Sequence, residues 1–440
     1  MKKTLFTGGI DFGPSTIDLK ERFTLEPEIV VYEPEEVKIP FNQHIGAPNK
    51  VQVAIGERVR AGQTIAMSDE AISGHVHASI SGIVTDICEV PTLDGKTQTA
   101  VVIKRDNTKK ERPILPLSLE GSVIERVREA GVVGLGGATF PTHIKLATPN
   151  DDLKIRYLIL NGAECEPLIH SDDYLMRQFS EEIIRGAQIV CESLHVEKIL
   201  IAIERDKPEA IERMKKTAAK FSNCQVFALP TRYPQGGQKQ LVETLLGVEA
   251  PLNQRTSETG ALTINVATAK AIYDAIACHE PLLRRLITVT GDVKKRQVIS
   301  FPLGTCISEL IAFCDGIDGK LSRILHGGPM MGIAVHHLQT PLTKGSNGLV
   351  VLNQEHDQIL PESPCIRCNR CVKSCPMRLE PQMIDQAMRV GDFVRCAQLQ
   401  AEQCINCGCC TYVCPAKRQL AAKITEAKKT LKRIRKEARQ

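Results

Sequence analysis

The first regular pattern along the chain is a set of short runs in which apolar and polar residues alternate. Two such runs are VQVAI (51–55) and SGIV (81–84), and glycine-containing turns separate them. A period of two is typical of strands that bury one face, so this region predicts a small all-β domain at residues 46–105. The residues before it, 1–45, are dotted with proline and predict an extended N-terminal segment.

A different pattern, strands that alternate with helices, occupies the middle of the chain. Continuous apolar runs predict buried strands at residues 156–160, 199–203 and 226–229. Strands and helices alternating at this spacing indicate an α/β domain with a largely parallel sheet, which we place at residues 115–285. The helices are expected at residues 123–130, 181–193 and 208–220.

Three further segments complete the chain. Residues 286–350 return to short strands with glycine turns and predict a small module, and residues 355–420 are rich in cysteine. Residues 421–440 form a basic segment with an apolar stripe at steps of three and four residues. The stripe consists of Leu420, Ile424, Ala427, Leu431, Ile434 and Ala438. The stripe predicts an amphipathic helix that is either solvated and partly frayed, or docked on a partner subunit with its basic face toward anionic lipid headgroups.

Composition narrows the class of protein. The chain has 440 residues, of which 42% are hydrophobic and 24% charged, as is ordinary for a globular protein of several domains. Its net charge of +5 comes from the basic tail, and it has no Trp, so nucleic acid is not expected as a partner. No apolar run is long enough for a membrane span or a signal peptide. The sequence therefore predicts a cytoplasmic protein, or one that partners hold at a membrane.

Cysteine gives the strongest chemical signal. The pattern C-x-x-C-x-x-C-x-x-x-C-P occurs twice, at 365–376 and at 404–415. Three thiolates two residues apart wrap one corner of a cubane, and in two-cluster ferredoxins the fourth cysteine ligates the other cluster. We therefore predict two [4Fe–4S] clusters with crossed ligands: Cys365, Cys368, Cys371 and Cys414 for one, and Cys404, Cys407, Cys410 and Cys375 for the other. Zinc, the alternative, has no use for the doubled pattern. Cys396 and Cys409 are expected not to be ligands.

Three short motifs mark a candidate ligand site in the α/β domain. The first is the loop GVVGLGGATFP (131–141), whose glycines let backbone N–H groups approach a phosphate, with Lys145 following as a point charge. A generic tight turn is the alternative for this loop. The second motif, NGAECEP (161–167), follows a predicted strand, at the sheet edge where open α/β folds bind ligands. The third is YPQGGQKQ (233–240).

Together with HGGPMMG (326–332) and the doubled cysteine pattern, these motifs resemble the C subunit of the Rnf electron-transport complex over about residues 5–420. The α/β core is also similar to the flavin- and NADH-binding subunit of respiratory complex I. The resemblance implies a multidomain α/β and α+β fold. Its parts are an unmodified lipoyl-like barrel-sandwich hybrid, a complex I flavoprotein-like core, an SLBB-like β-grasp module with a scaffolding role, and a two-cluster bacterial ferredoxin-like domain.

The resemblance to the complex I subunit implies FMN as a non-covalent cofactor and NAD(H) as substrate. The residues that would hold FMN are Gly134, Gly136, Gly137, Ala138, Phe140, Lys145, Asn161, Asn265 and Thr268. Glu164 and Glu166 would line the NADH side as catalytic residues, and Gly236 and Gly237 would let the dinucleotide approach. Thr139 departs from the pattern because it stands where the family has glycine.

The function that the resemblance implies is that of a peripheral electron-input subunit at the cytoplasmic face of the bacterial inner membrane. Electrons would pass between NAD(H), FMN and the two clusters, and the partners would be the other Rnf subunits, both membrane and ferredoxin-type. A cobalamin reductase of the diol-utilisation type shares the core and clusters, but such proteins start near the glycine loop. An electron-transfer adaptor with a vestigial nucleotide site is the non-enzymatic alternative.

Overall fold

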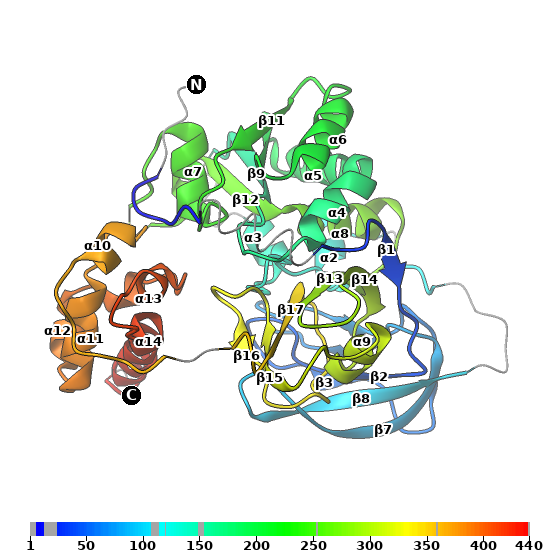
Figure 1. Ribbon diagram of the computed structural model, residues 1–440. Coiled ribbons are helices and arrows are strands. Elements are labelled where there is room, and N and C mark those ends of the chain that lie inside the picture. The colour runs from blue at the N-terminus through cyan, green and yellow to red at the C-terminus, as the bar shows by residue number, and fades with distance from the viewer. Residues whose placement is uncertain are drawn as a thin grey trace.

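Four modules, each with its own apolar core, make up the protein. The structure is a computed structural model that describes residues 6–12, 24–106, 114–118, 120–147, 154–251, 254–357 and 360–438. In Figure 1 the α/β core lies at the top, the barrel-sandwich module at the bottom right and the β-grasp module in front of them, while the cysteine-rich module lies to the left. The multidomain fold expected from the sequence is confirmed.

The barrel-sandwich module consists of two small sheets. Its strands are β2 (Glu36–Pro40), β3 (Lys50–Val51), β4 (Arg58–Val59), β5 (Thr64–Met67), β6 (Val76–His77), β7 (Gly82–Pro91) and β8 (Thr97–Arg105). One sheet has the order β2-β8-β7-β4 and the other β3-β5-β6. Val37 and Ile39, two residues apart on β2, are fully buried against Ile103 of β8, because every second residue of a strand faces the same side.

The N-terminal segment contributes strands to two modules. β2 pairs antiparallel with β8, and β1 (Ile29–Val31) pairs in parallel with β14 (Gln297–Pro302) of the β-grasp module. The barrel-sandwich module therefore starts with β2 rather than at residue 46, and residues 1–45 are not a separate extended segment over the part described. Both strands lie at sheet edges, where the neighbouring prolines cost no ladder hydrogen bond.

The α/β core has a sheet in which every pairing is parallel, as the alternation of strands and helices predicts. Its elements are α2 (Val123–Glu129), α3 (Thr142–Leu146), β9 (Tyr157–Gly162), α4 (Ser171–Gln178), α5 (Ser180–Leu194), β10 (Lys198–Glu204), α6 (Pro208–Ala218), β11 (Cys224–Leu229), α7 (Gln238–Leu246), η1 (Thr256–Thr259), β12 (Ala261–Asn265) and α8 (Val266–Ala277). In the order β11-β10-β9-β12, the two central strands are covered on both faces, which explains their continuous apolar runs. At the carboxyl edge, Asn265 is the register partner of Asn161.

The β-grasp module packs one helix on a mixed sheet. Besides β14 it contains β13 (Arg284–Gly291), α9 (Ile307–Phe313), β15 (Leu321–His326), β16 (Ile333–Ala334) and β17 (Gly348–Asn353). Together with β1 from the N-terminal segment, these strands form the order β1-β14-β13-β17-β15-β16. The apolar side chains of α9 and of the strands share one core, so the glycine-punctuated strands expected at residues 286–350 are present.

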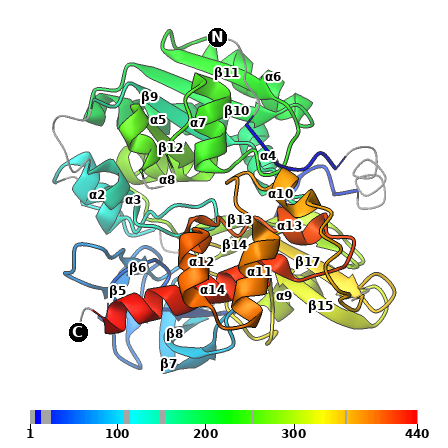
Figure 2. The ribbon, with the colours of Figure 1, turned by 90° about the vertical axis from the view of Figure 1, so that its left-hand side faces the viewer.

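The cysteine-rich module is built from short helices and one long one. They are α10 (Arg370–Ser374), α11 (Pro381–Arg389), α12 (Phe393–Gln398), η2 (Ala401–Gln403), α13 (Cys409–Tyr412) and α14 (Leu420–Glu437). Figure 2 shows this module face on, with α14 running across it behind α11 and α12. Among the described residues, no helix is both long and apolar enough to pass through a bilayer.

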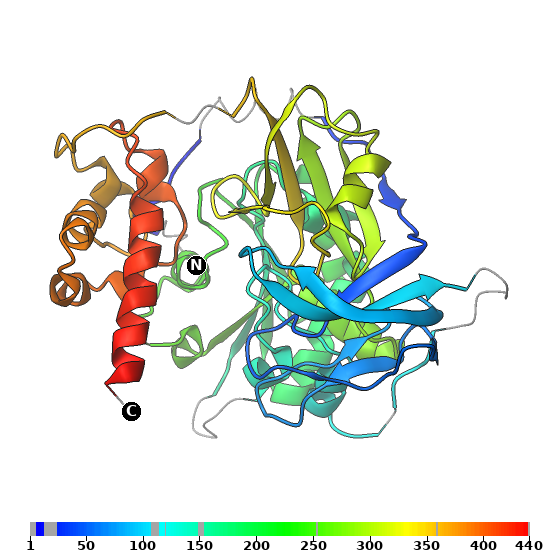
Figure 3. The same cartoon turned by 90° about the horizontal axis from the view of Figure 1, so that it is seen from below.

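The apolar stripe of α14 is covered by the module to which the helix belongs. Leu420, Ile424, Ala427 and Leu431 are at most 6% exposed and share a core with α11. Figure 3 shows α14 lying beside the other helices of the module. The expectation that this stripe docks on a partner is therefore wrong: an amphipathic pattern shows that a face is buried, but not which surface buries it.

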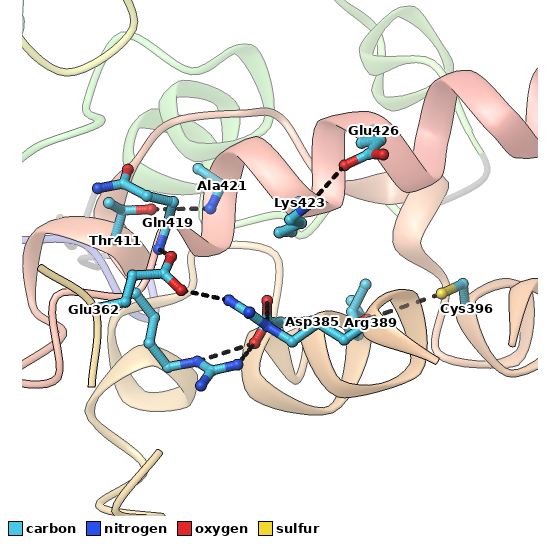
Figure 4. A network of polar contacts seen from close by, with 11 residues as sticks. Glu362, Asp385, Arg389, Cys396, Thr411, Gln419, Ala421, Lys423 and Glu426 are labelled. Carbon is cyan, nitrogen blue, oxygen red and sulfur yellow. Dashed lines mark hydrogen bonds and ion pairs between the residues drawn. The ribbon is translucent and has the colours of Figure 1, made fainter. Parts of the chain in front are cut away.

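A charge network centred on the buried Asp385 joins the start of α14 to both cysteine segments (Figure 4). The Asp385 carboxylate of α11 is 1% exposed and accepts hydrogen bonds from Arg389 Nε and Arg418 Nε, each at 3.0 Å. The Glu362 carboxylate accepts the Gln419 N–H at 2.8 Å and a hydrogen bond from Arg389 Nη2 at 2.7 Å. Because Glu362 precedes the first cysteine pattern and Arg418 follows the second, the network holds the two ends of the module together.

We expect Ile424→Ala to destabilise the cysteine-rich module by about 2–5 kcal/mol, because it leaves a cavity among fully buried side chains. Hydrogen exchange of α11 and α14 amides, measured by mass spectrometry, should accelerate accordingly. Ile434→Ala on the same helix is the matched control: Ile434 is 41% exposed, and its truncation should change exchange little. Equal exchange rates in the two variants would contradict the intramolecular packing of α14.

Candidate functional site

The glycine-rich loop is anchored at one buried residue and open at its tip. The Leu135 N–H donates to Thr268 Oγ1 at 2.9 Å, and the Leu135 carbonyl accepts a hydrogen bond from Arg285 Nη2 at 2.9 Å. Residues 136–138, which follow this anchor, are exposed. A buried anchor with an exposed glycine tip presents backbone N–H groups to a ligand. The Thr268 side chain therefore fixes the buried base of the loop through a hydrogen bond to its backbone.

The conformation of the tip requires glycine at one position. Gly137 has a φ of +102°, and no atom lies within 4 Å of the place that a Cβ would take. At the base of the loop, the Gly134 N–H donates to the Phe140 carbonyl at 2.8 Å. Thr139 has a φ of +48°, so the loop adopts a left-handed backbone there although the residue carries a side chain. Ala138 lies between these two positive-φ residues.

Two other modules hold the loop from behind. The Ile45 N–H of the barrel-sandwich module donates to the Thr139 carbonyl at 3.1 Å. Lys344 of the β-grasp module is fully buried, and its Nζ donates to the Gly131 carbonyl at 2.7 Å and to the His75 carbonyl at 2.6 Å. The shape of the loop therefore depends on three modules at once.

Lys145 lies on α3, just beyond the loop, in partly buried surroundings. Burial lowers the pKa of Lys145 to about 8. Within the described ranges, no hydrogen bond or ion pair reaches its Nζ. An ammonium group in this position lacks a counter-charge, and an anionic group bound at the loop would supply one.

The strand ends and the third motif meet beside the loop. Asn265 Nδ2 donates to Asp172 Oδ2 at 2.6 Å, and Asn265 Oδ1 caps α8 by accepting a backbone N–H at 2.8 Å. Asn161 Nδ2 donates to the Gly236 carbonyl at 2.9 Å. A Cβ built at Gly136 would lie 3.5 Å from Asn265 Cβ. The structure thus brings residues of all three motifs into one continuous set of contacts.

Glu164 caps a helix. Its carboxylate accepts the N–H groups of Asp172 at 2.6 Å and Asp173 at 3.0 Å, at the start of α4, and contacts the Ser171 hydroxyl at 3.3 Å. Burial, followed by the nearby Asp172 carboxylate, raises the pKa of Glu164 well above that of an ordinary glutamate. Lys207, which donates to the Glu164 carbonyl at 3.2 Å, opposes this shift. The Glu164 carboxylate, which the resemblance places on the NADH side, therefore binds the start of α4.

Glu166 lies where three modules meet. Its carboxylate accepts the N–H groups of Met330 at 3.0 Å and Met331 at 2.8 Å, from the loop HGGPMMG of the β-grasp module. The Tyr233 hydroxyl lies 3.4 Å from the same carboxylate and donates to the Cys407 carbonyl at 2.7 Å. Burial raises the pKa of Glu166. The third glycine motif is therefore in direct contact with a cysteine loop.

Gly236 and Gly237 differ in what a side chain would meet. A Cβ at Gly236 would make ordinary contact, 3.5 Å from Cys165 Sγ. A Cβ at Gly237 would lie 2.3 Å from Gln240 Oε1 and 3.2 Å from the Pro234 carbonyl. A side chain at Gly237 would therefore displace the Gln240 amide at the start of α7, whereas Gly236 leaves room beside the strand end.

Five cysteines line one small apolar cavity. Four of them are pattern cysteines, which we call the inner cysteine set: Cys375, Cys404, Cys407 and Cys410; the fifth is Cys409. Burial, and then the charges of Cys407 and Cys404, raise the pKa of the Cys375 thiol. Because Cys375 belongs to the first pattern and the other three to the second, the fold brings together the four cysteines that crossed ligation of one cluster would use. Thiols gathered from two segments around one cavity fit a cluster with four thiolate ligands.

The remaining pattern cysteines form the outer cysteine set: Cys365, Cys368, Cys371 and Cys414. Cys365 and Cys368 are exposed, and the charge of Cys414 contributes, after burial, to the raised pKa of Cys371. Across the described ranges, no three Cys, His, Asp or Glu side chains converge as ligands of one metal ion. Cys396 and Cys409 belong to neither set and are fully buried in apolar cores.

Comparison with protein families accounts for three of the modules. The chain matches the RnfC barrel sandwich hybrid domain over residues 6–108, the Nuo51 FMN-binding domain over residues 127–274 and the SLBB domain over residues 286–334. The NAD+-reducing [NiFe]-hydrogenase in its H2-reduced state shares the fold, with a TM-score of 0.50 and 18% identity over 68% of this chain and 62% of that chain. These matches define a multidomain protein built on a flavoprotein-type core.

Two curated relatives give the family. The chain is 43% identical over 375 residues to the C subunit of the proton-translocating ferredoxin:NAD(+) oxidoreductase complex of Clostridium ljungdahlii, covering 83% of this chain and 81% of the relative. It is 36% identical over 441 residues to the C subunit of the Na(+)-translocating ferredoxin:NAD(+) oxidoreductase complex of Acetobacterium woodii, covering 98% of both. The chain belongs to the family of C subunits of these complexes, in agreement with the resemblance found in its motifs.

Several residues of the site escaped the sequence analysis. Arg285 contacts Leu135 from a strand that follows 150 positions later, and no local pattern marks such a contact. Lys344 is also isolated in sequence from the loop that it holds. Tyr233 could have been found, because it is the first residue of the third glycine motif.

The crossed arrangement makes a prediction about Cys375→Ser. This variant should lose the same iron–sulfur EPR signal as Cys404→Ser, because both residues belong to the inner cysteine set, and about half of the iron should be lost. Cys396→Ser, which changes a buried cysteine outside both sets, should keep both signals. A spectrum of Cys375→Ser that matches that of Cys371→Ser instead would contradict the crossing.

Proposed function

We propose that this chain transfers electrons between NAD(H) and the other subunits of an ion-translocating ferredoxin:NAD(+) oxidoreductase complex, through FMN and two [4Fe–4S] clusters. The observation that carries the proposal is the direct contact between the Nuo51-type core and the inner cysteine set, made by the Tyr233 hydroxyl and the Cys407 carbonyl. The names of the relatives and the matched FMN-binding family support the same function.

FMN would bind against the glycine-rich loop. The open space at Gly137 and the unpaired Lys145 fit a phosphate, which the N–H groups of residues 136–138 would bind. Gly134 and Phe140 shape the base of the loop, while Thr268 fixes its anchor. Asn161 and Asn265 would hold the ring through the strand ends. Bound FMN supplies the exchange between two-electron hydride transfer and one-electron transfer.

On the nicotinamide side, the chain would use Glu166 and the backbone at Gly236. Glu166 is fixed by the Met330 and Met331 N–H groups, so its carboxylate keeps one orientation while a dinucleotide approaches. Glu164 would act as a positioning residue: it orders the start of α4, from which Asp172 holds Asn265. These residues would bind and orient the dinucleotide, and none of them would be required to act as a base.

The two cysteine sets would hold the two [4Fe–4S] clusters, which provide one-electron storage when bound. The inner cysteine set lies against Tyr233, and the outer set lies farther along the module with two exposed members. The chain would be a peripheral subunit at the cytoplasmic face of the bacterial inner membrane, and its partners the remaining membrane and ferredoxin-type subunits. Support for this assembly comes from the names of the relatives, which describe subunits of translocating complexes.

The decisive experiment is anaerobic purification followed by flavin, iron and sulfide analysis and an optical titration with NADH. The proposal expects about one FMN and two clusters per chain, and bleaching of both chromophores by NADH. Purified protein that contains the clusters but no flavin, and that does not react with NADH, would favour the alternative of an electron-transfer adaptor. NADH-dependent reduction of cob(III)alamin at the rate of an artificial dye would favour a cobalamin reductase.

Gly137→Val should abolish FMN binding while both clusters persist. The substitution fills the open space at the loop tip and strains a backbone with a φ of +102°. Flavin fluorescence during reconstitution with FMN measures the effect. Gly316→Val is a matched control, because Gly316 also has a positive φ of +85° and open space around a Cβ, yet lies in the β-grasp module. Normal FMN uptake by Gly137→Val would remove the loop from the site.

The lowered pKa of Lys145 predicts a pH dependence. Lys145 is cationic below a pKa of about 8 and neutral above it, so the affinity for FMN should fall as the pH rises through about 8. Lys145→Met should bind FMN about tenfold more weakly at pH 7 and show no step near pH 8. Isothermal titration of the flavin-depleted protein between pH 7 and 9 checks both. An identical pH profile in the variant would exclude Lys145 from phosphate binding.

A further inference from the structure

A cavity of about 600 Å³ lies behind the glycine-rich loop, at a place where three modules meet. The α/β core contributes residues of α4 and α8, the β-grasp module contributes β13, and the barrel-sandwich module contributes β4 and the turn before β7. Of the described residues, neither the exposed loop tip at 136–138 nor Lys145 lines this cavity. The cavity is therefore distinct from the loop tip against which FMN would bind.

Much of the cavity wall is apolar. Side chains from all three modules contribute to it, among them Val59, Ile80, Leu175, Phe179, Leu283 and Leu286. Sites that bind small molecules are typically cavities of about 300–1,000 Å³, often between domains, with apolar walls and a few polar groups that orient the ligand. The volume and the wall of this cavity are of that kind, so its polar groups decide which ligand fits.

Arg285 is a cation of the wall that lacks a counter-charge. It lies on β13, is 6% exposed, and makes one hydrogen bond with the described residues, from Nη2 to the Leu135 carbonyl at 2.9 Å. Its Nε is buried without a partner among the same residues. The other cations among the described lining residues are all in ion pairs: Arg58 with Asp106, Arg105 and Arg284 with Glu33, and Lys270 with Asp274.

Asp172, the acidic side chain that interacts with Arg285 at longer range, is bound elsewhere. Its Oδ2 accepts a hydrogen bond from Asn265 Nδ2 at 2.6 Å, and burial raises the pKa of Asp172, which favours the uncharged carboxyl. Burial lowers the pKa of Arg285 to about 10, so the guanidinium is still cationic at neutral pH. Burying a charge with one neutral partner is unfavourable, and an anionic group of a ligand would supply the missing partner.

We propose that this cavity binds a small organic anion, with a carboxylate or phosphate group against Arg285 and an apolar body between α4, α8 and β13. Arginine suits both groups, because its planar set of donors matches two oxygen atoms of either. Arg285 also holds the Leu135 carbonyl, so the bound anion and the base of the glycine-rich loop share one side chain. The ligand is therefore an effector of the loop and not a substrate bound at its tip.

The test uses the full-length holoprotein in excess FMN, so that the loop tip is occupied. Isothermal titration compares three probes with the same apolar body: naphthyl phosphate, naphthoate and the uncharged naphthalenemethanol. Both anions should bind at one site, at least about tenfold more tightly than the alcohol, because the alcohol leaves Arg285 without a counter-charge. The tighter of the two anions tells which acidic group the site prefers. Equal affinity for the alcohol and the anions would overturn the proposal.

Two kinds of variant test the site itself. Ala271 of α8 is 5% exposed and lines the cavity, so Ala271→Phe should fill it and weaken both anions at least about tenfold. Ala277→Phe is the matched control, because Ala277 lies on the same helix, is exposed and is not part of the wall. Arg285→Met should remove the preference for anions over the alcohol, whereas Arg285→Lys, which keeps the charge, should retain part of it. Because Arg285→Met also frees the Leu135 carbonyl, Ala271→Phe tests the site without changing Arg285.

Hydrogen exchange measured by mass spectrometry locates the ligand. Saturating naphthyl phosphate should slow amide exchange in α8, in β13 and in residues 131–141 of the wild-type chain, and should leave exchange in Ala271→Phe unchanged. Protection confined to other parts of the chain would overturn the proposal, and so would anion binding that Ala271→Phe does not weaken. Unchanged exchange of residues 131–141 would refute the effector role. The measurements use neither NADH nor electron transfer, so their outcome is separate from that of the proposed function.

Discussion

The contact between Tyr233 and Cys407 is the constraint on which the arrangement of modules depends. A buried hydroxyl that donates at 2.7 Å to a backbone carbonyl fixes both partners, because leaving either group unpaired would cost about 1–3 kcal/mol. Around it, Ile10 pairs with Tyr233, the Gly9 N–H donates to the Ser374 carbonyl at 2.9 Å, and Glu166 binds the loop at Met330. These contacts hold the cysteine-rich module in one place relative to the strand ends.

Hydrogen bonds from several modules also fix the shape of the glycine-rich loop. Its backbone is held by Thr268 and Arg285 on one side, and by Ile45 and Lys344 from other modules on the other side. A loop with open space at its tip has little packing of its own, so these external hydrogen bonds set its shape. The barrel-sandwich and β-grasp modules therefore support the candidate site even though neither contributes a residue expected to bind a cofactor.

Much of this could be predicted from the sequence, because its strongest signals are local. The period of two, the alternation of strands with helices and the doubled cysteine pattern each fix an element from neighbouring residues. The predictions that were wrong concerned which surface a helix or a side chain contacts. The apolar stripe of α14 correctly predicted a buried helix face, but Leu431 packs against its own module and not against another subunit. Glu164 has a carboxylate at a strand end, but the start of α4 lies close enough to take it. Such outcomes depend on residues distant in sequence.

The long-range contacts of the N-terminal segment have a consequence for folding during synthesis. β1 lies beside β14, and Ile10 and Gly9 bind Tyr233 and Ser374, so these residues are synthesised long before the partners that they bind. Modules can close one after another during translation, but this leading segment has to wait unpaired. Its docking would therefore be a late step of folding, and this step would join the α/β core to the cysteine-rich module.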